Sequence, residues 1–208
     1  MRSIAQQFRT VTPILLIVWL VTLLALLFGI YVSTVKQIPL ETFTKDPTAI
    51  MNAPFYLGFF SNIGIIIWSG TAMINFFVAY RIKNDYTQKN TFLFFLSSAI
   101  LTLILTLDDL FQLHELVFRN YFSVSDNAVY LTYLNIFLIY FIYFRKRILE
   151  SEFTILTVAL FLLGLSTMID ILPLPIPKVT FLEDAIILLG ITTYFIYYFR
   201  TGNEILST

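Results

Sequence analysis

Long apolar stretches separated by short polar connections run along the whole chain. A helix needs about 20 apolar residues to cross a hydrocarbon layer of about 30 Å. Six stretches reach or approach that length, and none alternates between apolar and polar residues as a half-buried strand does. We therefore predict one all-α, polytopic transmembrane domain over residues 1–208, a bundle with six transmembrane helices near 13–35, 55–80, 92–118, 128–144, 153–171 and 181–199.

Local signals mark several of these boundaries. Thr12 followed by Pro13 is typical of a helix cap with proline at the first helical position. Thr180 with Glu183 three residues later fits a capping box at the start of the last helix. The proline-rich run 173–177 cannot be helical and predicts an extended connection before the last helix.

The composition supports a membrane protein and excludes several kinds of site. Apolar residues make up 58% of the chain and charged residues 12%, with a mean hydropathy of +0.83, whereas soluble domains carry about 25% charged residues. Thirteen basic residues balance thirteen acidic ones, so we expect membrane lipids as partners and no nucleic acid. The absence of cysteine and the single histidine exclude iron–sulfur clusters and common forms of haem attachment.

The distribution of Lys and Arg among the loops predicts the orientation, because cytoplasmic loops are enriched in these residues. With the N-terminus inside, nine of them lie on the cytoplasmic side and four outside. We therefore expect a multi-pass protein of the plasma (cytoplasmic) membrane with both termini cytoplasmic. The nine are Arg2, Arg9, Arg81, Lys83, Lys89, Arg145, Lys146, Arg147 and Arg200, and the four are Lys36, Lys45, Arg119 and Lys178.

An acidic segment near the outer end of the third stretch is the main candidate for chemistry. It holds Asp108 and Asp109, followed by His114 and Glu115. About 20 residues of hydrocarbon counted from Phe92 place both aspartates inside the membrane boundary. An ionised carboxylate in lipid costs several kcal/mol, so these side chains should face protein or a wet cavity.

A continuous helix would place most of these groups on one face. With Asp108 at 0° and about 100° per residue, Glu115 falls near −20° and Asp109 near +100°, whereas His114 falls near −120°. His114 could then join Glu115 but could not face the same point as Asp109 without a distortion of the helix. Three smaller polar residues extend the polar face inward: Ser98, Thr102 and Thr106.

Three more acids are expected at the same membrane depth. Asp170 ends the fifth helix, and Glu183 and Asp184 lie in the first turn of the sixth. Each also has an ordinary alternative role, at a helix end or at the membrane interface. Tyr130 and Tyr133 on the fourth helix lie at this depth and could donate hydrogen bonds to carboxylates, although aromatic packing is the commoner role.

Carboxylates gathered in a low dielectric must share protons or bind a cation. Carboxylate oxygens suit Mg²⁺, Ca²⁺, Mn²⁺ or iron, and one imidazole would permit iron or zinc. We therefore predict a site for a divalent metal ion, with His114 and Glu115 as catalytic groups. The candidate ligands are Asp108, Asp109, His114, Glu115, Asp170, Glu183 and Asp184.

Three functions fit this cluster near the outer membrane face. We rank first a metal-dependent membrane enzyme, a hydrolase or an oxidoreductase, that acts on a lipid or another amphiphile. The first alternative is movement of a cation or proton, with the inward polar face as a partial path. The second is a structural subunit whose acids receive basic residues of other membrane proteins.

Overall fold

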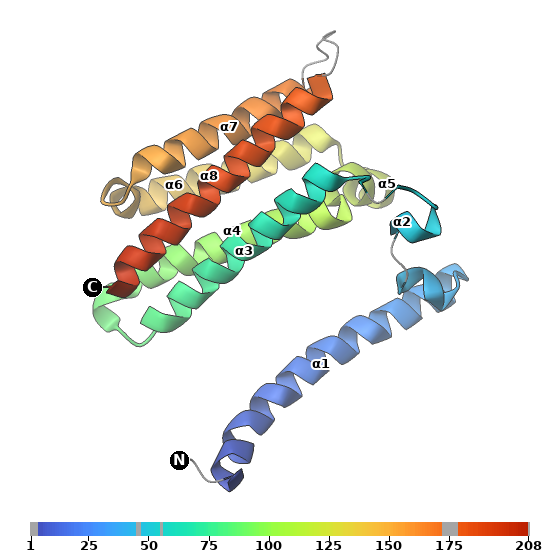
Figure 1. The fold of residues 1–208 in the computed structure, drawn as a ribbon, viewed down its shortest axis with the longest axis horizontal. Coiled ribbons are helices and arrows are strands. Elements are labelled where there is room, and N and C mark those ends of the chain that lie inside the picture. Colours follow the sequence, from blue (N-terminus) through green and yellow to red (C-terminus); the bar gives the residue numbers. More distant parts are fainter. Residues whose placement is uncertain (1–3, 45–46, 55, 172–178, 208) are drawn as a thin grey trace. The chain divides into compact units, whose positions relative to one another are not determined.

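The computed structural model describes residues 4–44, 47–54, 56–171 and 179–207. Every regular element in this described part of the chain is helical (Figure 1). The contacts divide the chain into two compact units, Met1–Leu57 and Gly58–Thr208. Each unit is described by itself.

One long helix dominates the first unit. Helix α1 spans Ile4–Lys36 and is followed by the short helices η1, Leu40–Phe43, and α2, Pro47–Ile50. The predicted cap at Thr12 is wrong, because Pro13 lies inside α1. A proline inside a helix removes one backbone hydrogen bond, which membrane-spanning helices commonly tolerate.

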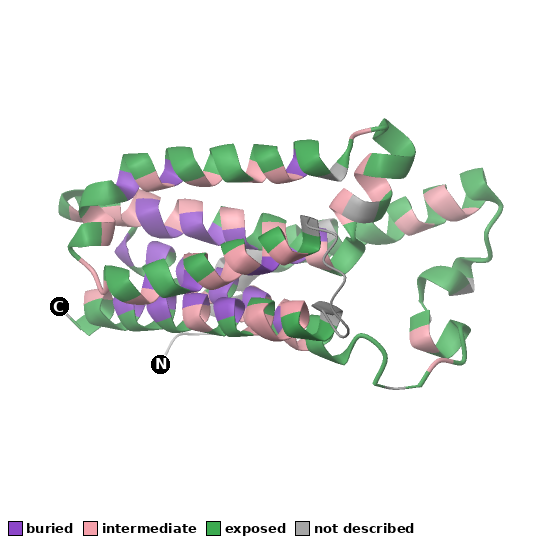
Figure 2. Cartoon of the chain, turned by 90° about the horizontal axis from the view of Figure 1, so that it is seen from above, coloured by how far each residue is buried: buried purple, intermediate pink, exposed green. Residues whose placement is uncertain are grey.

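The second unit is a helical bundle. Helix α3 contacts both α4 and α8, α7 packs along α8, and α6 contacts α4. The buried positions follow the helix sides that face other helices (Figure 2). In chain order its elements are α3 (Phe59–Ile82), η2 (Tyr86–Gln88), α4 (Lys89–Phe111), η3 (Leu113–Phe118), α5 (Arg119–Phe122), α6 (Asp126–Leu149), α7 (Phe153–Ile171) and α8 (Val179–Ser207).

The prediction of six helices that could cross a membrane is confirmed by their length and composition. These candidate spans lie in α1, α3, α4, α6, α7 and α8. The last one continues to Ser207, well beyond the predicted end near 199, and the third ends at Phe111 instead of 118. The run 173–177 and the side chain of Thr180 lie outside the described residues.

Aromatic side chains fill the interior of the bundle away from the α4 C-terminus. Phe94 and Phe95 on α4 are fully buried. They pack against Tyr140 and Phe144 of α6 and against Tyr198 of α8. Nearly all of the buried polar groups are uncharged: Thr71, Asn75, Ser98, Thr102, Thr106, Ser166 and Thr201 are buried, together with Asp108.

The glycines of α3 and α8 permit close contact between helices. A Cβ atom at Gly64 would lie 3.3 Å from Ile191 Cδ1 and 4.0 Å from Asp109 Oδ2. A Cβ atom at Gly190 would lie 2.9 Å from Leu163 Cδ2. The first of these glycines therefore brings α3 close to α8 and to Asp109 of α4.

Candidate functional site

Helix α4 stops abruptly just after the two aspartates. Gln112 adopts a left-handed conformation, with φ 49° and ψ 47°, and its N–H donates to the carbonyl oxygen of Asp108. The next six residues, Leu113–Phe118, form a π-helix. Because π-helical turns are rare and often occur at functional sites, this segment is a candidate functional site.

The irregular turn brings the histidine back onto the first aspartate. His114 Nδ1 lies 2.7 Å from Asp108 Oδ2, and the backbone N–H of His114 donates to Asp108 Oδ1 over 2.9 Å. The side chain of Asp108 is 8% exposed and that of His114 is 17% exposed. We call these two residues the Asp108–His114 pair; it is buried on the carboxylate side and partly open on the imidazole side.

An ionised carboxylate can only accept hydrogen bonds. Beside the Asp108 carboxylate, His114 Nδ1 therefore carries the hydrogen, and the other ring nitrogen, Nε2, keeps its lone pair while the ring is neutral. The second hydrogen bond, from the His114 backbone, fixes the carboxylate relative to the ring. The two contacts together hold the imidazole in one orientation.

Helices α6 and α7 complete the surroundings of the imidazole. The ring of Tyr130 lies 5.2 Å from the His114 ring, measured between centroids. The Tyr130 hydroxyl donates to Asp170 Oδ2 over 2.9 Å. Tyr133, about one turn away on α6, also interacts with the Asp108 carboxylate. For Tyr130, the hydrogen bond to an acid is the role that the sequence analysis placed second to aromatic packing.

The helical projection of the sequence is wrong beyond Phe111. It assumed a continuous helix to Glu115, which kept His114 far from the polar face. The left-handed residue Gln112 ends the helix, and the following turn reverses that separation. The helix is therefore distorted at Gln112, and this distortion lets His114 reach an aspartate. That aspartate is Asp108.

The other predicted acids do not converge on this pair. Asp109 approaches Gly64 of α3, and Asp170 accepts the hydrogen bond from Tyr130. Glu183 and Asp184 are partly buried in the first turns of α8. The side chain of Glu115 lies outside the described residues.

The predicted metal centre and carboxylate cluster are therefore not supported. In the part of the chain that the structure describes, no three His, Cys, Asp or Glu side chains lie close enough together to hold a metal ion. The physical reason is that successive acids on α4 point to different neighbours. Asp108 turns toward the π-helix and Asp109 toward α3.

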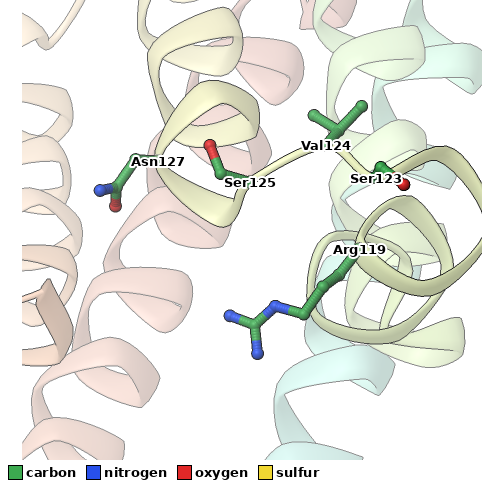
Figure 3. A pocket seen from close by; sticks show the side chains of 5 residues that line it. All are labelled: Arg119, Ser123, Val124, Ser125 and Asn127. Carbon is green, nitrogen blue, oxygen red and sulfur yellow. The ribbon is translucent and has the colours of Figure 1, made fainter.

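A polar cavity lies next to this segment, at the turn from α5 into α6. It has a volume of about 520 Å³. The Arg119 side chain extends from α5 into the open space below the start of α6 (Figure 3). The remaining lining residues are Ser123, Val124, Ser125 and Asn127.

The sequence analysis named all four residues around the His114 imidazole, but it missed which of them contact each other. They are Asp108, Tyr130, Tyr133 and Asp170. The separation between Asp108 and His114 is six residues, which no regular α-helical spacing favours. Tyr130 and Asp170 are forty residues apart. No signal in the sequence reveals the left-handed conformation of Gln112, since glutamine is not a residue that favours it.

The described residues define a helical protein with six potential membrane spans and a buried Asp–His pair at one end of its bundle. The family described as "Domain of unknown function (DUF8692)" matches residues 12–201, and the chain belongs to that family. No curated protein and no solved structure matches the chain.

Proposed function

We propose that this protein is a membrane-embedded enzyme that uses His114 as a general acid–base group on a lipid or another amphiphile. The observation that carries the proposal is the double contact of Asp108 with the ring and the backbone of His114, at 2.7 and 2.9 Å. A general base must be held in one orientation and one tautomer, and a buried carboxylate provides both.

The chemistry follows from the second ring nitrogen, Nε2, which faces away from the Asp108 contact at Nδ1. His114 Nε2 takes a proton from a water molecule or a substrate hydroxyl, which then attacks the substrate, and later returns the proton to the leaving group. The Asp108 carboxylate balances the positive charge that the ring carries in between. This favours hydrolysis or group transfer at an ester-like linkage.

Two features at the same end of the bundle favour an amphiphilic substrate. The polar cavity contains the guanidinium of Arg119 and the hydroxyl groups of two serines, which suit a charged or polar headgroup. A second, apolar groove of about 370 Å³ runs between α3 and α8, lined by residues such as Phe60, Phe181 and Leu188. It suits an acyl chain.

Lipid turnover by the purified full chain tests the proposal. In liposomes of total polar lipids, mass spectrometry should detect a lipid product with the wild type. Asp108→Asn and His114→Gln should each lower the rate by about 10²–10⁴-fold, the usual contribution of acid–base catalysis. Glu204→Gln, an exposed acid near the C-terminus of α8, is the matched control and should keep full activity. Equal rates in all four proteins would contradict the proposal.

The single histidine allows a second test that needs no substrate. With ¹⁵N-labelled histidine, only His114 gives an imidazole signal. The wild type should show the neutral tautomer with hydrogen on Nδ1, and Asp108→Asn should change the tautomer or mix the two. An averaged signal that Asp108→Asn leaves unchanged would show that the pair is not formed.

A divalent ion held through Glu115 stays a prediction from the sequence. Its test is elemental analysis of the purified protein against Glu115→Gln. The proton transfer proposed above uses His114 and Asp108, which bond directly to each other, and does not depend on this ion.

A further inference from the structure

Buried hydroxyl groups follow the interior of the bundle from the level of Thr106 to the loop between α6 and α7. From the sequence, only Ser98, Thr102 and Thr106 were expected on this inward face, as a partial path. All three are almost completely buried. Tyrosines of α6 and α8 join them and extend the row beyond the end of the α4 polar face.

The central part of the row is a directional chain of hydrogen bonds. Ser98 Oγ donates to the Phe94 carbonyl oxygen over 2.6 Å. Tyr140, 2.6 Å from Ser98 Oγ, must then donate to it, and Tyr198, 3.2 Å from the Tyr140 hydroxyl, must donate to Tyr140. In a second arrangement, Ser98 donates to Tyr140 and Tyr140 donates to Tyr198. Ser98 then gives up its bond to the Phe94 carbonyl oxygen, which can only accept. A chain with two such arrangements is what proton transfer between hydroxyl groups requires.

Two further pairs of hydroxyl groups lie beyond this chain, one toward each end of the bundle, and their tyrosine rings pack on the ring of Tyr198. Toward the Asp108–His114 pair, Thr102 Oγ1 lies 3.3 Å from the hydroxyl of Tyr194, whose ring packs on Tyr198 with centroids 4.7 Å apart. Toward the other end, Tyr197 lies 2.8 Å from Ser151 Oγ in the α6–α7 loop.

A buried amide lies at the same level as Ser98. Gly64 of α3 approaches Asp109 of α4, and the two helices are antiparallel. Asn75, eleven residues after Gly64, is therefore level with Ser98, eleven residues before Asp109. Asn75 is 0% exposed, and neither its Nδ2 nor its Oδ1 has a hydrogen-bond partner within the described residues. Buried amides in this situation are typically satisfied by ordered water.

We propose that these groups form a proton path through the bundle, in which the hydroxyl chain is linked by water held at Asn75. Each hydroxyl passes on its own proton and receives another, so that one proton moves and no group is consumed. The path runs between the level of Thr106, two residues before Asp108 on α4, and Ser151, in a loop that the Lys and Arg count predicts to be cytoplasmic. It develops the alternative of proton movement and does not require that the Asp108–His114 pair catalyses lipid turnover.

The charged groups at the loop end suit the entry or exit of a proton. Arg147 pairs with Glu150 at 4.0 Å, on either side of the last turn of α6. Glu152 forms an ion pair with Arg200 of α8. Glu150 and Glu152 flank Ser151 in the sequence, and their side chains are 51% and 40% exposed, so charged groups in contact with solvent lie beside the end of the row.

Proton flux into proteoliposomes tests the path. The full chain is reconstituted in phosphatidylcholine vesicles that contain a pH-sensitive dye, and a potassium gradient with valinomycin drives the flux. The wild type should acidify the vesicles faster than protein-free vesicles. Tyr198→Phe keeps the ring packing and removes only the hydroxyl, so the flux should fall about tenfold, as expected when one buried hydrogen-bond partner is lost. Tyr143→Phe, on the exposed side of α6, is the matched control.

Asn75→Leu provides an independent variant, because leucine has a similar size and cannot hold water. Its flux should also fall, and its folding is checked by thermal unfolding beside the wild type. A wild-type flux equal to that of protein-free vesicles, or full flux in both Tyr198→Phe and Asn75→Leu, would overturn the proposal. The His114 imidazole signal should be unchanged in Tyr198→Phe, so failure of the path and failure of the Asp108–His114 pair can be told apart.

Discussion

Hydrogen bonds to one carboxylate organise the connection between α3 and α4. Asp85 accepts bonds from the backbone N–H of Thr87 at 2.9 Å, from its hydroxyl at 2.6 Å and from Gln88 Nε2 at 2.9 Å. These bonds, the Thr87 hydroxyl first, hold the pKa of Asp85 below its ordinary value of 3.8. Asp85 is the N-cap of the short helix η2, and aspartate is among the residues preferred at that position.

The lowered pKa of Asp85 predicts how its contribution depends on pH. A group whose pKa is lower in the folded state stabilises that state above its unfolded pKa, and the effect is lost as the pH falls through the folded pKa. Asp85→Ala should therefore lower the thermal unfolding midpoint in detergent at neutral pH. The difference from the wild type should shrink below pH 3.8. A difference that stays constant down to strongly acidic pH would contradict this account.

At the same scale, the Asp108–His114 pair shows how one backbone conformation decides the chemistry. Composition and depth in the membrane identify both residues as candidates. Whether they touch depends on Gln112, whose left-handed conformation ends the helix. Such a conformation costs about 1–2 kcal/mol for a residue with a side chain, and the surrounding contacts must supply it.

The packing of neighbouring helices depends on small residues at particular points. Helices α7 and α8 approach closely at Gly190, where a Cβ atom would lie 3.0 Å from Leu163 Cγ and 3.2 Å from its backbone nitrogen. A backbone atom cannot move aside as a flexible side chain can. Gly164, on α7, has no atom within 4 Å of the position that its Cβ would take.

The two glycines therefore form a matched pair of tests. Gly190→Ala should destabilise the bundle by about 1–3 kcal/mol, the usual cost of overpacking. Gly164→Ala should be neutral or stabilise it by up to about 1 kcal/mol, because alanine favours a helix more than glycine does. Chemical unfolding in mixed micelles measures both. Equal effects of the two substitutions would show that α7 and α8 do not approach closely at Gly190.

The number of long helices could be predicted from the sequence, but the residues at which they begin and end could not. The six long apolar stretches correspond to six long helices, because apolar length is a property of the local sequence. The end of α4 was missed by seven residues, since it is set by one strained position and not by a proline or glycine. The start of α1 was missed because a helix can continue through Pro13.

At the scale of the whole molecule, the charges of the loops predict an orientation in the membrane. The Lys and Arg count predicts that the α3–α4 loop is cytoplasmic and that the α5–α6 loop is external. The absence of native cysteine makes this directly measurable. Asn84→Cys and Ser123→Cys place one thiol in each loop, at exposed positions.

A maleimide that does not cross membranes should label Ser123→Cys in intact cells and Asn84→Cys only after the membrane is opened. The wild type is the blank control, since it carries no thiol. The reverse pattern would invert the predicted orientation and would place the Asp108–His114 pair at the cytoplasmic face. The geometry of the pair would be unchanged, but its substrate would have to come from the inner leaflet.

The sequence by itself determined the class of this protein, because the length and polarity of each apolar stretch decide locally whether a helix can cross a membrane. It also determined which residues were candidates, since a carboxylate or imidazole inside such a stretch is costly wherever it points. Only the tertiary structure decided which of them meet. The contacts of Asp108 with His114, of Tyr130 with Asp170 and of Tyr140 with Tyr198 depend on how each helix ends and is rotated against its neighbours, and packing between distant segments sets both.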